Sequence, residues 1–165
     1  MSSEHTKQDD AAKITELIES SNDMAMLTTR APDGTLTSRP MALQKAEFTG
    51  DLWFFAARSS SKMDHIANDP QVNVTFGSAS TWVSFTGTAE VVSDAAKKQE
   101  LWNSAVEAWF PEGPDSDEVI LVKVDGDSAE YWDSPGGRLA TLLSFAKAKV
   151  TGKPYEGGDN ESVEL

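Results

Sequence analysis

Short segments in which hydrophobic and polar residues alternate occur along most of the chain, and this period of two is typical of half-buried β-strands. Seven segments alternate in this way or are short and largely apolar: 24–30, 35–45, 52–57, 72–76, 82–92, 119–124 and 128–132. Pro32-Asp33-Gly34 and Asp125-Gly126-Asp127 each separate two such segments and are strong hairpin signals. Consecutive hairpins join antiparallel neighbours, so the pattern predicts an antiparallel sheet, and many short strands favour a barrel.

Apolar residues with helical spacing of three and four mark a smaller number of helices. We expect helices after Asp9-Asp10, from Ser59 or Ser60 to Asn68, after Ser93-Asp94 as far as Phe110, and over 139–150. The sequence lacks the regular βαβ alternation of a parallel sheet and a glycine-rich phosphate loop. The predicted fold is therefore mainly β with flanking helices (α+β), with a flexible N-terminus at 1–10, one domain at 11–150 and a C-terminal tail at 151–165.

Three local features refine the predicted strands. Pro40 lies inside one strand and lacks a backbone donor, which favours an edge position. Gly87 interrupts the longest strand and predicts a bulge or bend. The segment 52–57 is almost entirely apolar, so we expect it to be buried on both faces.

Charge and composition limit the classes of function. The 165 residues carry 14 Lys+Arg and 27 Asp+Glu, a net charge of −13 that argues against nucleic-acid binding. Cysteine is absent, which excludes disulfides and thiolate chemistry. The sequence contains no apolar run long enough to span a membrane and no signal-peptide core, so we expect a cytoplasmic protein.

The negative charge is concentrated late in the chain. Residues 107–133 hold nine acids and one base, whereas residues 13–62 hold six of each. We interpret the acidic segment as a solvated surface, because Asp115-x-Asp117-Glu118 lacks the glycine and spacing of a calcium loop. An anionic ligand is expected to bind the earlier, neutral part.

Two basic residues in that earlier part are candidates for anion binding. Arg39 lies in a predicted strand, where alternation places it on the same face as Met41. Lys62 follows three serines at the start of a predicted helix, where backbone N–H groups, hydroxyls and an ammonium suit a phosphate. The alternative interpretation is a capped surface helix with a solvated lysine.

Histidine chemistry has little support in the sequence. His5 lies near the N-terminus, and His65 has no second histidine at metal-ligand spacing. We expect His65 to be a surface or hydrogen-bonded structural residue, and we expect no metal site. A Gly-x-Ser-x-Gly elbow is also absent, so hydrolase chemistry is poorly supported and no catalytic residue is assigned.

Several motifs, taken in order, resemble the pyridoxamine 5'-phosphate oxidase-like superfamily, and within it the flavin-binding general stress proteins. They are Ser38-Arg39-Pro40-Met41, Leu52-Trp53-Phe54-Phe55-Ala56, Ser61-Lys62, the segment 68–74, the segment 82–89 and Ala129-Glu130-Tyr131-Trp132-Asp133. The likeness covers the chain from about Ile14 onward. It implies a split β-barrel that binds FMN at a homodimer interface.

The resemblance also implies roles for individual residues. The strand with Arg39, Pro40 and Met41 would lie along the flavin, with Arg39 near the phosphate or ring. Backbone groups of Phe54, Phe55 and Ala56 would meet the polar edge of the ring, Ser61 and Lys62 would hold the phosphate, and Trp132 would pack on the flavin of the partner subunit. Ala56 departs from many relatives, which have threonine there. The basic residues with which the vitamin B6 oxidases bind substrate are unmatched, which argues against that reaction.

These implications leave several functions open. The first is an FMN-dependent oxidoreductase of unknown substrate, and the second is a non-catalytic flavin carrier or stress-response protein. A third is a deazaflavin-dependent reductase, while haem is disfavoured because His65 is the single internal histidine. The aromatic residues at 53–55 also suit a core, and the five tryptophans suit either a core or a dimer interface.

Overall fold

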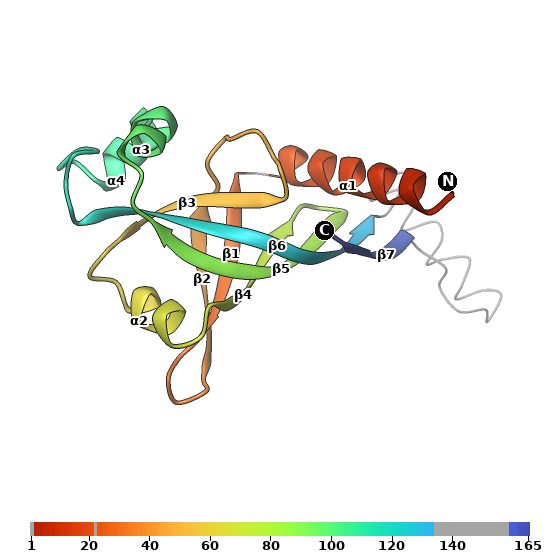
Figure 1. Cartoon of the computed structure of the whole chain (residues 1–165), viewed down its shortest axis with the longest axis horizontal. Coiled ribbons are helices and arrows are strands. Elements are labelled where there is room, and N and C mark those ends of the chain that lie inside the picture. The colour runs from red at the N-terminus through yellow and green to blue at the C-terminus, as the bar shows by residue number, and fades with distance from the viewer. Residues whose placement is uncertain (1, 22, 134–158) are drawn as a thin grey trace.

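The computed structural model describes residues 2–21, 23–133 and 159–165, which form one antiparallel sheet with helices around it (Figure 1). The strands are β1 (Met24–Arg30), β2 (Leu36–Ala42), β3 (Asp51–Ala57), β4 (Gln71–Gly77), β5 (Thr81–Val92), β6 (Val119–Asp133) and β7 (Asp159–Glu164). The helices are α1 (Ser2–Ser20), α2 (Ser61–Asn68), α3 (Ala95–Leu101) and α4 (Ser104–Trp109). The predicted mainly β, α+β class is confirmed.

The sheet closes into a split barrel. Its strand order is β2-β1-β4-β5-β6-β3, and β7 adds to β6 outside this path. The two end strands meet at one isolated bridge between Leu43 and Phe54. Among the described residues β2 and β3 share no further ladder, so the barrel stays open along this seam. Pro40 lies on β2, so its predicted edge position is confirmed.

The predicted hairpin at Asp125-Gly126-Asp127 is wrong, because β6 continues through these residues as one strand. Both halves of β6 pair with β5, and the register shifts between Thr86 and Gly87, which leaves Asp127 as an extra residue. The result is a β-bulge, as predicted at Gly87. A Cβ on Gly87 would lie 2.2 Å from the Asp125 carbonyl oxygen, so glycine allows a close approach that a turn prediction does not consider.

The helices differ from their predicted bounds in two places. The helix expected as far as Phe110 is divided into α3 and α4, because the Asn103 side chain caps α4 by accepting from the N–H groups of Ala105 and Val106. Helix α1 begins at Ser2, and β7 lies within the segment predicted as a tail. The helix predicted over 139–150 lies outside the described residues. No described helix is long and apolar enough to cross a membrane.

Two hydrophobic cores lie on opposite sides of β3. Leu52, Phe54 and Ala56 belong to the main core inside the barrel, together with residues of α1, α2 and the other strands. Phe55 belongs to a second core beneath α3 and α4, and Trp53 packs against it. Burial of the 52–57 segment on both faces is therefore confirmed.

The face of the sheet that points away from the main core carries exposed apolar side chains. Met24 and Met26 of β1, Trp82 of β5 and Trp132 of β6 are 52%, 41%, 45% and 38% exposed. Trp82 and Trp132 are direct cross-strand partners. Scattered exposed apolar residues are ordinary, but four on one sheet face form a patch of the kind that buries against another surface.

Candidate functional site

The Arg39 side chain lies on the inner side of β2, near the end of the barrel that α2 covers. Arg39 pairs with Leu27 of β1, so the two side chains share a face of the sheet with the buried Thr29. Nη1 of Arg39 donates to Thr29 Oγ1 at 2.8 Å and to the Leu27 carbonyl oxygen at 3.5 Å. Burial lowers the pKa of Arg39 from its usual value, although a guanidinium remains charged at any ordinary pH.

The second terminal nitrogen of Arg39 is unsatisfied. Nη2 is buried and, of the buried side-chain atoms in the described residues, it alone has no hydrogen-bond partner. Leaving a buried donor unpaired costs about 1–3 kcal/mol, and more when the group is charged. An acceptor supplied by a ligand would remove this cost, so Nη2 marks a position at which an anion fits.

Lys62 brings a second positive charge to the same place. Its Nζ is 3.1 Å from Ser60 Oγ, to which it donates. Burial and, second, the positive charge of Arg39 both lower the pKa of Lys62. The positive charge of Arg39 therefore acts on Lys62, which is consistent with one anion site that uses both cations.

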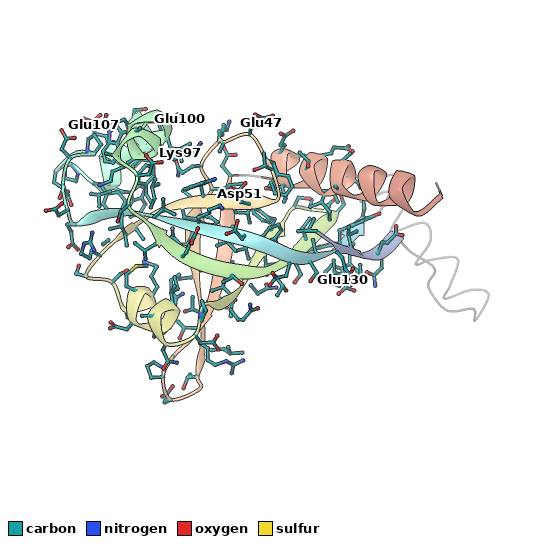
Figure 2. The ribbon with its side chains drawn as sticks, viewed as in Figure 1. Glu47, Asp51, Lys97, Glu100, Glu107 and Glu130 are labelled. Atoms are coloured by element: carbon teal, nitrogen blue, oxygen red, sulfur yellow. The ribbon has the colours of Figure 1, made fainter. Side chains whose placement is uncertain are left out.

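No carboxylate of the described residues forms an ion pair with Arg39 or Lys62. Among the described residues, the ion pairs involve Lys13, Arg30, Lys45, Lys97 and Lys123, and include neither Arg39 nor Lys62. The acids of residues 107–133 do not gather into one patch either, since Glu107 lies by α4 and Glu130 lies well away from it along the sheet (Figure 2). A small anion would thus meet an uncompensated positive site in a protein of net charge −13.

The N-terminus of α2 adds backbone donors to the site. Ser60 is its N-cap residue, but the Ser60 hydroxyl makes no capping bond to the helix and donates instead to the Ala57 carbonyl oxygen at 2.7 Å. Ser61, the first residue of α2, is exposed. Uncapped N–H groups at a helix start attract anions, especially beside an ammonium.

The loop that carries these serines is attached to the end of the α4–β6 connection. Arg58 Nε donates to the Asp117 carbonyl oxygen at 2.7 Å, and the backbone N–H of Ser59 donates to Glu118 Oε1 at 3.0 Å. The Ser59 hydroxyl donates to the same carboxylate oxygen. Segments 59 positions apart in the sequence therefore fix the start of α2.

His65 is also part of the site, and the sequence did not predict this role for it. It lies one turn along α2 from Lys62, and its Nδ1 is 2.9 Å from Thr29 Oγ1, the hydroxyl that accepts from Arg39. The expectation of a hydrogen-bonded histidine is confirmed, but its partner was not foreseen. The i, i+3 spacing of Lys62 and His65 on a helix was the available signal.

The remaining predicted site residues occupy two kinds of position. Met41, Phe54, Phe55 and Ala56 have buried side chains, so only backbone atoms of β3 are open to a ligand along the seam with β2. Pro40 is exposed on the outer face of β2.

Trp132 and Arg39 lie on opposite faces of the sheet within one chain. Trp132 is on β6 and is 38% exposed on the outer face, whereas Arg39 points inward from β2. The structure therefore places Trp132 on the other side of the sheet from Arg39 of the same chain.

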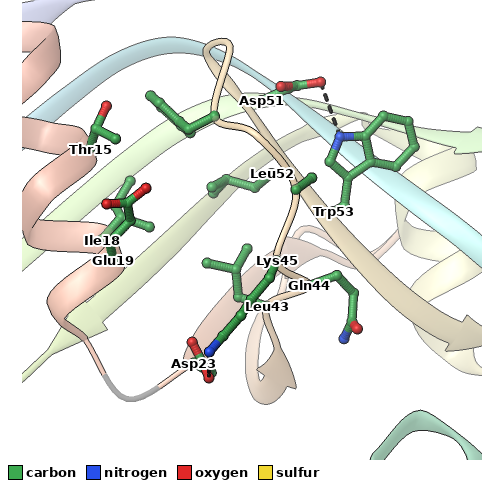
Figure 3. A pocket seen from close by; sticks show the side chains of 12 residues that line it. Thr15, Ile18, Glu19, Asp23, Leu43, Gln44, Lys45, Asp51, Leu52 and Trp53 are labelled. Carbon is green, nitrogen blue, oxygen red and sulfur yellow. Dashed lines mark hydrogen bonds and ion pairs between the residues drawn. The ribbon is translucent and has the colours of Figure 1, made fainter. Parts of the chain in front are cut away.

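A separate cavity of about 300 Å³ lies between the end of α1 and the segment that joins β2 to β3 (Figure 3). Its floor includes Ile18 and Leu52, and its lining includes Glu19, Asp23 and Asp51. None of the residues around Arg39 lines it. Its carboxylates make it unsuitable for a phosphate, so it is not the anion site.

Comparison with known proteins identifies the family to which this chain belongs. The family model described as "Pyridoxamine 5'-phosphate oxidase like" matches residues 9–156, which is most of the chain. The protein belongs to this family. The family predicted by resemblance is confirmed.

Individual relatives agree with this assignment. The protein bli-3 of Neurospora crassa is 33% identical over 146 residues, which cover 81% of this chain and 70% of bli-3. A structure assigned to general stress protein 26 of Jannaschia sp. CCS1 has a TM-score of 0.76 at 24% identity and covers 96% of this chain and 99% of its own. The general stress FMN/FAD binding protein of Xanthomonas citri has a TM-score of 0.61 at 26% identity, over 72% of this chain and 89% of its own.

Proposed function

We propose that this protein binds FMN, with the flavin phosphate held by Arg39, Lys62 and the N-terminus of α2. The observation that carries the proposal is the buried Nη2 of Arg39, which has no partner among the described residues, within electrostatic reach of the Lys62 ammonium. A phosphate supplies acceptor oxygens for both cations and for the N–H groups at Ser61. Family membership and the printed name of the Xanthomonas citri neighbour support a flavin as the phosphorylated ligand.

The open seam of the barrel suits the flavin ring. Beyond the bridge of Leu43 and Phe54, the described edges of β2 and β3 are unpaired, so their backbone groups are available to the polar edge of the ring. Backbone atoms at Phe54, Phe55 and Ala56 need no particular side chain for such contacts. The alanine at position 56 is therefore compatible with ring binding, although it offers no hydroxyl.

We further propose that the functional unit is a homodimer that packs through the patch of Met24, Met26, Trp82 and Trp132. Exposed aromatic and methionine side chains are enriched at protein interfaces. Trp132 lies on the other face of the sheet from Arg39 in its own chain, so we expect any flavin that it touches to be bound mainly by the partner. The two proposals are linked, because FMN binding would then depend on dimerisation.

When bound, FMN supplies electron- and hydride-transfer chemistry, and the protein supplies binding and orientation. We infer a flavin-dependent oxidoreductase of the cytoplasm rather than a vitamin B6 oxidase. Anaerobic mixing with NADPH tests this role, since rapid bleaching of the flavin followed by reoxidation with an acceptor supports catalysis. Flavin that stays oxidised would support the non-catalytic carrier or stress-response protein instead.

Equilibrium titration of the apo-protein with FMN, FAD, riboflavin and a deazaflavin cofactor tests the binding proposal. We expect FMN to bind most tightly and riboflavin, which lacks the phosphate, at least about tenfold more weakly. Lys62→Ala should weaken FMN binding by a similar factor. Lys123→Ala is the matched control, because Lys123 is already paired with Asp51, Glu90 and Asp125. Equal affinity for FMN and riboflavin would contradict the phosphate site.

A further inference from the structure

We propose that His65 is a positioning residue for the anion site, which acts on Arg39 through the hydroxyl of Thr29. This inference rests on the proposed FMN function and goes beyond it, because it assigns a role to two residues that do not themselves contact the phosphate. Three side chains from three elements form the chain of contacts: His65 from α2, Thr29 from β1 and Arg39 from β2.

The direction of each hydrogen bond follows from the chemistry of the groups. Arginine only donates, so Thr29 Oγ1 accepts from Arg39 Nη1 at 2.8 Å. The single hydroxyl hydrogen of Thr29 then needs an acceptor. Thr29 is 1% exposed, so bulk solvent does not reach it, and the acceptor that the structure places in reach is His65 Nδ1, 2.9 Å away. The hydroxyl therefore donates to Nδ1, and the ring hydrogen of His65 is on Nε2.

The reverse arrangement leaves a group unsatisfied. If Nδ1 carried a hydrogen, Thr29 Oγ1 would accept from both His65 and Arg39, and its own hydrogen would have no acceptor among the described residues. A buried hydroxyl without a partner is unfavourable. The neutral Nε2–H tautomer is therefore the one in which every member of the chain is bonded.

The consequence for the ligand is a fixed guanidinium. Threonine has a stiff χ1, so its bond to His65 holds the oxygen in one place, and that oxygen holds Nη1 of Arg39. The guanidinium is planar, so fixing Nη1 also fixes the position of the free Nη2. His65 thus prepares the donor that a phosphate needs before the phosphate arrives, which reduces the ordering required on binding.

Two variants at position 65 separate this role from simple packing. His65→Leu removes the acceptor and should weaken FMN binding by about tenfold, with little change for riboflavin, because only the phosphate contact depends on Arg39. His65→Asn offers an oxygen near the place of Nδ1 and should restore most of the FMN affinity. Thr29→Val should resemble His65→Leu, whereas Thr88→Val, which removes a hydroxyl that accepts from Gln71, should leave both affinities unchanged.

The outcomes are distinct. If wild-type protein fails to prefer FMN over riboflavin, the proposed function is wrong, whatever position 65 does. If it prefers FMN and His65→Leu keeps the same ratio of the two affinities, or lowers both equally, the positioning role is overturned. Nitrogen-15 NMR of the His65 side chain in wild-type protein reports its tautomer directly. This check needs no variant, so a variant that fails to fold cannot affect it. A signal from the Nε2–H tautomer supports the proposal, and the Nδ1–H tautomer overturns it.

Discussion

Glu118, directly before β6, is hydrogen-bonded to Ser59 in the loop before α2, and one carboxylate oxygen of Glu118 accepts from both the backbone N–H and the hydroxyl of Ser59. These two bonds, followed by the charge of Arg58, hold the pKa of Glu118 below its usual value. The contact ties the serines that precede Lys62 to β6. A surface carboxylate thereby fixes the geometry of the anion site from outside it.

The ionised form of Glu118 is the one that the folded protein favours. Because its pKa is lower in the folded state than in the unfolded state, its contribution to stability is complete above the unfolded pKa of about 4.5 and is lost as the pH falls through the folded pKa. We expect Glu118→Gln to be less stable than wild type near pH 7, with the difference shrinking below about pH 4. Urea unfolding over this pH range measures it. Glu112→Gln, at an exposed acid, should show no such convergence.

Lys62 should oppose folding when no ligand is present. Burial and the charge of Arg39 lower its pKa, so in the apo-protein stability should rise as the pH increases from the folded pKa of Lys62 toward its unfolded value near 10.5. Replacing the lysine by methionine removes the charge and keeps the apolar stem. We expect Lys62→Met to raise the apo melting temperature slightly and to reduce the further rise that FMN produces.

Thermal melts with and without FMN test whether Lys62 lowers the stability of the apo-protein and strengthens FMN binding. The informative quantity is the FMN-induced increase in melting temperature, compared between wild type, Lys62→Met and Lys123→Met. A Lys62→Met protein that melts well below wild type without ligand, yet gains as much from FMN, would refute the assignment.

The sequence contained enough information for most of the barrel but not for the complete site. Strand β1 has the predicted bounds because alternation and the turn at Pro32-Asp33-Gly34 are local signals. The role of Thr29 was not predictable, because its partners Arg39 and His65 come from β2 and α2. Local patterns identify elements, whereas hydrogen bonds between elements depend on how the sheet curls.

Gly126 shows the same limit in the fold itself. An Asp-Gly pair between two apolar runs is a good hairpin signal, yet here both runs pair with β5, so the glycine lies within one strand. A Cβ on Gly126 would be 2.5 Å from the Phe85 ring and 2.9 Å from the Gly50 carbonyl oxygen. Glycine is needed for close packing at this position rather than for a turn, and sequence spacing cannot distinguish the two causes.

The bulge can be tested through Gly87. Its backbone does not have a positive φ, so the expected cost of Gly87→Ala comes from the clash of the new Cβ with the Asp125 carbonyl, 2.2 Å away. We expect a loss of about 3 kcal/mol or more in the free energy of unfolding, as for other overpacked or strained sites. Gly77→Ala is the control, since its nearest neighbour is the Trp82 side chain at 3.3 Å, which can move. Similar small losses of unfolding free energy for both variants in urea unfolding would contradict a close approach of the Asp125 carbonyl to Gly87.

The proposed dimer makes a prediction that links assembly to cofactor binding. Trp132→Glu places a charge in the exposed patch that includes Met24, Met26 and Trp82, and burying an unpaired charge is strongly unfavourable. We expect this variant to sediment as a monomer at concentrations where wild type is a dimer, and to lose FMN affinity. Trp109→Glu is the matched control, because Trp109 is 80% exposed on α4 and lies outside the patch. A wild-type monomer that binds FMN fully would show that one chain forms the whole site and that Trp132 has no part in it.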